Sequence, residues 1–371
     1  MTSAEFMAVV RATSAVRIEP ENAIVTKLSD PEGDIEVVIY SQYEDTPSVK
    51  GIPSDLIFRL RGISRDLDSG AKKLADRAST CAAIASFAAN AAIDELQLEL
   101  VFDCSRQSDR RPFMQNLLPL PGPPRSSRVL GTEAFVSVLG AVSSHPDAER
   151  MSRALAQYEI ALRHAVPGHE IMALAHLWIV AETLTPIFRE REIVRAGGRD
   201  ALLQAWGIVI QKLDSSVRER CVLEGNHDLY SQARQASDGF EHGYLEISKI
   251  RALSSSRLGE LWASIRRAIL NALEIDDPLG DRNGSSQPSP LPCIRTGRRV
   301  QAELVASEAD LAAGPLEYPM LSLTSEIQEV RHHPGGRCDI DYKDEYRFHV
   351  AAGASFENIQ VEIVAPDPGN Q

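Results

Sequence analysis

One stretch of the chain, residues 228–243, concentrates polar side chains that could bind a charged group or exchange a proton. These polar residues are Tyr230, Arg234, Asp238, Glu241 and His242. Their spacing fits a single helix, so a guanidinium, an imidazole and two carboxylates would share one short element. They are the candidate functional residues of the chain.

The same residues have a purely structural interpretation. Arg234 and Asp238 are one helical turn apart, a spacing that favours an ion pair. His242 would lie at the helix C-terminus, where the helix dipole favours positive charge, and Gly243 suits the position just beyond a helix end. The carboxylates of Asp238 and Glu241 would repel a phosphate backbone. This interpretation argues against catalysis at these residues.

Two short motifs, taken in order, resemble a known superfamily. They are Leu177-Trp178-Ile-Val-Ala-Glu182-Thr-Leu184 and Tyr230…Arg234…His242-Gly243. They look like the HEPN superfamily, small helical domains of toxin and defence ribonucleases and of many non-catalytic accessory proteins. The resemblance implies a metal-independent RNA endonuclease that works as a dimer. His242 would then act on the 2′-hydroxyl or leaving oxygen, and Arg234 would stabilise charge on the phosphate.

The chain also departs from the pattern of active HEPN ribonucleases. Seven residues separate Arg234 from His242, which is more than in those enzymes, and Gly239 is expected to interrupt the helix between them. On the resemblance, the candidate catalytic residues are Arg234 and His242, and the candidate binding residues are Tyr230, Asp238 and Glu241.

A narrower resemblance rests on the run Ala233-Arg-Gln-Ala-Ser-Asp-Gly-Phe-Glu-His-Gly-Tyr244. In a chain of this length, with a mixed N-terminal part and a strand-rich tail, this run is similar to the bacterial methylamine-utilisation protein J (MauJ) family. That family implies a cytoplasmic accessory protein of a methylamine-oxidising gene cluster, with no assigned catalytic residues. The link to methylamine would come from the neighbouring genes rather than from the chemistry of the residues.

Histidines and cysteines elsewhere are poorly spaced for a metal ion. His169 and His176 share a helix face but lie two turns apart, about 10.5 Å along the axis, which favours one surface histidine and one packing histidine. A second group consists of His332, His333, Cys338 and Asp341. Its adjacent histidines would point to opposite faces of a strand. We therefore predict neither a metal site nor a cofactor.

Composition and apolar patterning favour a cytoplasmic protein. The first residues do not resemble a signal peptide, and the five cysteines are scattered without a disulfide pattern. The most apolar window, Cys81–Ile93, is too short to span a membrane and fits a buried helix. With 52 acidic against 39 basic residues, the net charge of −13 excludes indiscriminate binding to nucleic acid or anionic membranes.

The patterning predicts an α+β chain with a central all-α, HEPN-like helical bundle. A mixed α/β N-terminal region and a β-rich C-terminal region would flank this bundle. The predicted boundaries are 1–117 for the N-terminal domain, 118–130 for a linker, 131–275 for the bundle, 276–297 for a second linker and 298–371 for the β-rich region.

Hydrophobic periodicity places the individual elements. Strands are expected at 8–18, 23–28, 35–40, 96–102, 300–306, 320–330, 339–350 and 359–364. Helices are expected at 147–164, from about 169 to Pro186, and at 201–213, 216–223, 228–242 and 245–273. An alanine-rich helix around residues 74–88 should lie against the sheet, because its small side chains permit a close approach.

Two functions from different classes follow from these observations. The first is a non-catalytic cytoplasmic accessory protein that binds a protein partner, or a second copy of itself, through its helices. The alternative is a metal-independent RNA endonuclease that uses Arg234 and His242. The acidic balance favours the first, with RNA as the less favoured partner and no membrane association.

Overall fold

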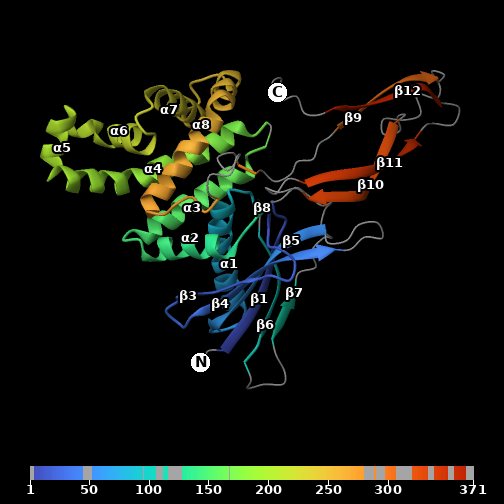
Figure 1. Ribbon diagram of the computed structural model, residues 1–371, viewed down its shortest axis with the longest axis horizontal. Coiled ribbons are helices and arrows are strands. Elements are labelled where there is room, and N and C mark those ends of the chain that lie inside the picture. Colours follow the sequence, from blue (N-terminus) through green and yellow to red (C-terminus); the bar gives the residue numbers. More distant parts are fainter. Residues whose placement is uncertain are drawn as a thin grey trace. The chain divides into compact units, whose positions relative to one another are not determined.

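The computed structural model shows an α+β protein that divides into two compact units. Met1–Tyr43 and Pro53–Pro292 form the first unit, and Glu44–Ile52 and Cys293–Gln371 form the second. The described residues are 4–44, 52–94, 96–105, 112–115, 128–166, 168–279, 288–289, 297–305, 320–332, 338–349 and 355–364. The first unit combines a six-stranded sheet with a layer of helices (Figure 1).

The sheet of the first unit has the strand order β3-β4-β5-β1-β6-β7. Its strands are β1 (Ala4–Ala12), β3 (Ile24–Leu28), β4 (Ile35–Glu44), β5 (Ile52–Ser64), β6 (Gln97–Asp103) and β7 (Phe113–Gln115). The central β1 pairs antiparallel with β5 and β6, which places Val10 opposite Phe58 and Leu98. Alternate residues of β1 from Phe6 to Ala12 are buried, so one face of the sheet covers the core.

The helices of the first unit include most of those that the periodicity predicted. They are α1 (Leu67–Ala89), α2 (Thr132–Ser144), α3 (Ala148–Arg163), α4 (Glu170–Ala196), α5 (Arg199–Trp206), α6 (Leu213–Val217), α7 (His227–His242) and α8 (Ile247–Leu273). A π-helical turn, η2 (Arg218–Val222), follows α6, and a 3₁₀ turn, η1 (Ile210–Lys212), precedes it. The helix α4 packs against α3, α7 and α8 and forms the centre of the layer.

The alanine-rich helix α1 contacts the sheet, as its small residues predicted. Asp66 caps its start by accepting a hydrogen bond from the Ser69 N–H at 2.8 Å. A Cβ atom at Gly70 would lie 3.0 Å from the Phe6 ring, so glycine permits this close approach to β1. Further along, every residue from Cys81 to Ala89 is buried, because other helices cover the second half of α1.

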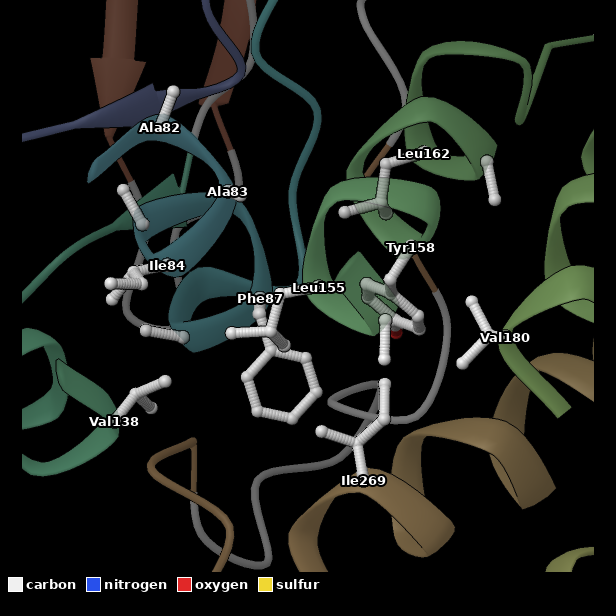
Figure 2. Packing of buried hydrophobic residues seen from close by; sticks show 14 of the residues in the cluster. Ala82, Ala83, Ile84, Phe87, Val138, Leu155, Tyr158, Leu162, Val180 and Ile269 are labelled. Carbon is white, nitrogen blue, oxygen red and sulfur yellow. The ribbon is translucent and has the colours of Figure 1, made fainter. Parts of the chain in front are cut away.

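A buried polar cluster joins α1, α3 and α8. The Tyr158 hydroxyl lies 2.7 Å from Asn90 Oδ1 and accepts a hydrogen bond from Trp262 Nε1 at 2.6 Å. The ring of Phe87 packs edge-on against Tyr158, with centroids 5.4 Å apart (Figure 2). Burial raises the pKa of Tyr158, so its hydroxyl stays protonated and can donate to Asn90.

A buried arginine extends this cluster towards the end of α8. Arg266 is only 2% exposed and donates through Nη1 to the Phe87 carbonyl at 2.6 Å. Its Nε and Nη2 bind both carboxylate oxygens of Asp277, at 3.0 and 2.6 Å. Burial alone would raise the pKa of Asp277, but the Arg266 guanidinium outweighs it and lowers that pKa. This bidentate pair fixes the segment after α8 to the end of α1.

The predicted central all-helical bundle with flanking regions is wrong. The N-terminal region is strand-rich, and its helix α1 belongs to the same buried core as α3 and α8 through Phe87, Tyr158 and Trp262. The sheet and the helices therefore form one compact unit. The pattern misled because an alanine-rich helix reveals only that close neighbours are possible. It does not reveal that other helices cover one half and a sheet covers the other.

The helix that was expected to end at Pro186 instead continues to Ala196. Proline removes one backbone donor, but that loss is local when packing holds the helix on both sides. Here the Thr185 hydroxyl bonds the Ala181 carbonyl at 2.7 Å, and Ile187 is buried immediately after the proline. The core therefore keeps α4 continuous.

The second unit contains two antiparallel strand pairs. β9 (Gly297–Val305) pairs with β12 (Ser355–Val364), and β10 (Met320–His332) pairs with β11 (Cys338–His349). The four strands that the alternation predicted in the tail are thereby confirmed. Most of the predicted linkers 118–130 and 276–297 lies outside the described residues.

We expect Tyr158→Phe to lower the free energy of unfolding by about 1–3 kcal/mol, because Asn90 loses a donor and Trp262 loses its shorter acceptor inside the core. Urea denaturation followed by circular dichroism measures this change. Tyr244→Phe is the matched control, since Tyr244 is 58% exposed and should change stability by less than about 0.5 kcal/mol. Equal effects of the two substitutions would contradict a structural role for the cluster.

Candidate functional site

The five candidate residues lie on α7, the helix that the sequence predicted for them. Asn226 caps its start, since its Oδ1 accepts a hydrogen bond from the Leu229 N–H at 3.0 Å. The helix ends at His242, and Gly243 follows with a left-handed φ of 66°. This confirms the helix-end interpretation of both residues.

Gly239 does not interrupt α7, contrary to expectation. It lies within the helix, and a Cβ atom at this position would approach Leu245 Cδ1 to 2.6 Å. Leu245 belongs to the turn between α7 and α8, which folds back over the helix. The glycine therefore makes room for a neighbouring side chain while the helix continues through it.

Arg234 is engaged by a carboxylate on its own helix. Its Nε lies 3.2 Å from Asp238 Oδ2, which confirms the predicted pair one turn apart. Nearby Tyr230 and the Asp238 carboxylate raise the pKa of Arg234, so the guanidinium remains charged. The guanidinium is also half exposed, and a phosphate that approached it would have to displace Asp238.

His242 lies away from Arg234 along the same helix. Eight residue steps of α-helix place them about 12 Å apart along the axis, so within one chain they are too far apart to hold a single phosphate between them. His242 is exposed, and the preceding Glu241 accepts a hydrogen bond from the Ser237 hydroxyl at 3.2 Å. Carboxylates on this helix are therefore engaged by Arg234 and by Ser237.

The structure brings the two resemblance motifs into direct contact, and an arginine that the sequence did not single out packs on the first of them. The rings of Trp178 on α4 and Tyr230 on α7 have centroids 5.7 Å apart. Arg218, from the π-helical turn, lies over the Trp178 ring at 5.2 Å and contacts Glu182 at 3.2 Å. Glu182 and Trp178 therefore both contact Arg218. As a result, α4, α7 and the π-helical turn pack together at this point.

A groove of about 1060 Å³ lies elsewhere, between the C-terminal end of α2, the start of α3, the second half of α4 and the end of α8. Its apolar lining includes Pro146, Ile187, Val194 and Leu273. It also contains four arginines, each bonded to a carboxylate, namely Arg150, Arg189, Arg191 and Arg195. Because carboxylates are fewer than arginines in this lining, the groove is less acidic than the chain as a whole.

One side of the groove is held in place by Arg191. Its guanidinium donates to the carbonyl oxygens of Asn271 and Ala272 at 2.9 and 2.7 Å and reaches Glu274 at 3.0 Å. These bonds add side-chain donors to carbonyls at the C-terminal end of α8, where few intrahelical donors are left. The second half of α4 and the end of α8 are thereby fixed to each other, so the groove is preformed.

Within the described residues, no three His, Cys, Asp or Glu side chains are arranged to hold a metal ion. In the second unit His332 lies opposite Cys338 in the β10–β11 pair, while Asp341 binds Arg331 at 2.9 Å. His333 lies outside the described residues.

His169 and His176 have the surroundings that the sequence predicted. His169 is exposed, as a surface histidine, and His176 is partly buried, with its Nδ1 2.8 Å from Gln157 Oε1. Their rings are bridged by His164 from the end of α3, which the sequence interpretation did not include. Spacing along α4 carried no signal for this residue, because it comes from the neighbouring helix.

One described helix, α4, is long and apolar enough to cross a membrane. Of its most apolar stretch, 61% is buried inside the fold, as in the core helix of a soluble protein. Its apolar character follows from its central place between α3, α7 and α8, and is weak evidence for a membrane span.

Comparison of the chain with protein-family models, curated proteins and solved structures found no match. The functional argument therefore depends on the geometry of these residues.

We expect Gly239→Ala to lower the free energy of unfolding by about 1–3 kcal/mol, because the new methyl group would collide with Leu245. Gly140→Ala in α2 is the matched control. It adds a methyl group that meets nothing within 4 Å, and it should stabilise the helix by about 0.5–1 kcal/mol. Thermal denaturation measures both variants. Stabilisation by Gly239→Ala would contradict the close packing of α7 against the turn.

Proposed function

We propose that this chain is a non-catalytic cytoplasmic accessory protein that acts by binding a protein partner. The ion pair between Arg234 and Asp238 carries this proposal, because it occupies the arginine on which RNA cleavage would depend. His242 lies about two turns away along the same helix. A site for phosphate chemistry would need positive charge where this helix places carboxylates.

The groove between α2, α3, α4 and α8 is the surface that we assign to the partner. Val194 is 79% exposed at this groove, and four arginines share the groove lining with it. Arginine is enriched at protein interfaces and at their energetic centres. Since Arg191 fixes the groove walls, the partner would meet a preformed surface, and binding would cost little ordering.

The resemblance of residues 233–244 to the MauJ family supports a role beside methylamine-oxidising enzymes. The proteins encoded in that type of gene cluster are therefore the first partners to test. The RNA endonuclease that uses Arg234 and His242 is the competing function, and its test is independent of the binding test.

We expect Val194→Glu to weaken binding of the partner at least about tenfold, because a buried charge at the centre of an interface is costly. Purified wild type and variant would be compared by biolayer interferometry against each protein of a methylamine-oxidising cluster. Val209→Glu is the matched control, since Val209 is also exposed, at 61%, and does not line the groove. Equal binding by both variants would exclude the groove, and no binding by wild type would exclude this set of partners.

We expect purified protein to leave mixed RNA intact in the presence of EDTA, even at high protein concentration. The reason is that Asp238 neutralises Arg234 and that His242 lies about two helical turns away from it. Gel analysis of RNA incubated with wild type, Arg234→Ala and His242→Ala provides the measurement. Cleavage by wild type that disappears equally in both variants would overturn the accessory function and establish the endonuclease.

A further inference from the structure

Three imidazoles from two helices meet at the corner between α3 and α4. His164 is the C-terminal cap residue of α3, and His169 is the N-terminal cap residue of α4. Their Nδ1 atoms lie 3.4 Å apart, with ring centroids separated by 5.6 Å. The ring of His176, on the second turn of α4, lies nearly parallel to that of His164, at 6° and 5.8 Å. We call these three residues the histidine cluster.

Only one hydrogen atom can lie between the Nδ1 atoms of His164 and His169. When both imidazoles are neutral, one Nδ1 can carry a hydrogen and the other can accept it. When both are protonated, each Nδ1 carries a hydrogen, and two N–H groups would face each other across 3.4 Å. Two positive charges would also lie side by side. The observed contact is therefore incompatible with double protonation.

The surroundings of the cluster provide little compensation for added charge. Burial lowers the pKa of His164, and the charges of His169 and Arg163 lower it further. Burial lowers the pKa of His176 as well, with a second contribution from His164. Glu159 binds Arg163, and Glu170 accepts a hydrogen bond from the Gly168 N–H at 3.0 Å through Oε1, while its Oε2 is buried without a hydrogen-bond partner. Neither carboxylate contributes to the lowered pKa of His164 or of His176.

We propose that the histidine cluster is a proton-sensitive latch, which keeps the α3–α4 corner closed near neutral pH and releases it in mild acid. Both cap residues of the corner belong to the latch, so its release frees the last turn of α3 and the first turn of α4. The middle of each helix stays in the core, because Tyr158 and Trp178 are held there by contacts independent of the histidines. The change is therefore a local opening.

The direction of the pH effect follows from the neutral form being favoured in the closed corner. The ordinary pKa of a histidine is 6.5, and the values of His164 and His176 lie lower in the folded chain. Above that ordinary value, closed and open corners bind equally few protons. Below it, the open corner binds protons that the closed one excludes, so closure weakens as the pH falls.

Hydrogen–deuterium exchange read by mass spectrometry tests the latch in the full chain. The protection of peptides from residues 157–176, corrected for intrinsic exchange, should fall between pH 7.5 and 5.5, by as much as about tenfold for each imidazole that the closed corner keeps neutral. Peptides from α8 serve as the internal reference and should keep their protection. All buffers contain EDTA, so that a metal ion held between the imidazoles cannot be the origin of the closed state.

Substitutions separate the latch from a general acid effect. Glutamine at positions 164 and 169 cannot take up a proton, so His164→Gln/His169→Gln should make protection of the corner independent of pH. His227→Gln, which replaces an exposed imidazole at the start of α7, is the control, and protection of the corner should behave as in wild type. A corner that opens equally in the double variant, or that stays closed in wild type at pH 5.5, would overturn the proposal.

A spectroscopic measurement covers the case in which the double variant folds poorly. In imidazole ¹H–¹³C spectra of His169→Gln, the titration midpoint of His164 should rise, because one neighbouring charge is removed. An unchanged midpoint would show that the two imidazoles do not interact, and would equally overturn the latch.

Discussion

The helical layer and the sheet depend on one buried polar contact, in which Asn90, Tyr158 and Trp262 satisfy each other's hydrogen bonds. Inside a core, a polar group without a partner costs far more than the same group in water. The three residues come from the end of α1, from α3 and from α8, so the withdrawal of any one of these elements takes a buried hydrogen-bond partner from each of the other two. Arg266 adds a charge with the same requirement and ties Asp277 to the carbonyl of Phe87.

This dependence explains which parts of the fold could be predicted from the sequence. Elements whose signal is local, such as α3 with its Asp147 cap and the strands of the tail, follow from periodicity and capping. The way in which these elements pack together could not be predicted, because Asn90 and Trp262 are 172 positions apart and neither residue indicates its partner in the sequence. The extension of α4 through Pro186 has the same origin, since tertiary packing outweighs the loss of one local hydrogen bond.

The contacts of the candidate site can likewise be divided into those that the sequence could predict and those that it could not. The pair of Arg234 with Asp238 and the helix end at Gly243 are contacts within one helix, and their spacing was enough to predict them. Arg218 over Trp178, and His164 between His169 and His176, join separate elements and had no signature in spacing. Gly239 was misjudged because a helix propensity says nothing about Leu245, which lies against it from the following turn.

The three surfaces described here are all parts of one helix. The N-terminal end of α4 carries the histidine cluster, its middle packs Trp178 against Tyr230 and Arg218, and its second half lines the groove. Such a helix must be largely apolar over its middle, because α3, α7 and α8 pack against it there. The side chains on which our proposals depend therefore lie towards its two ends, and the packed middle holds these ends in a fixed relation.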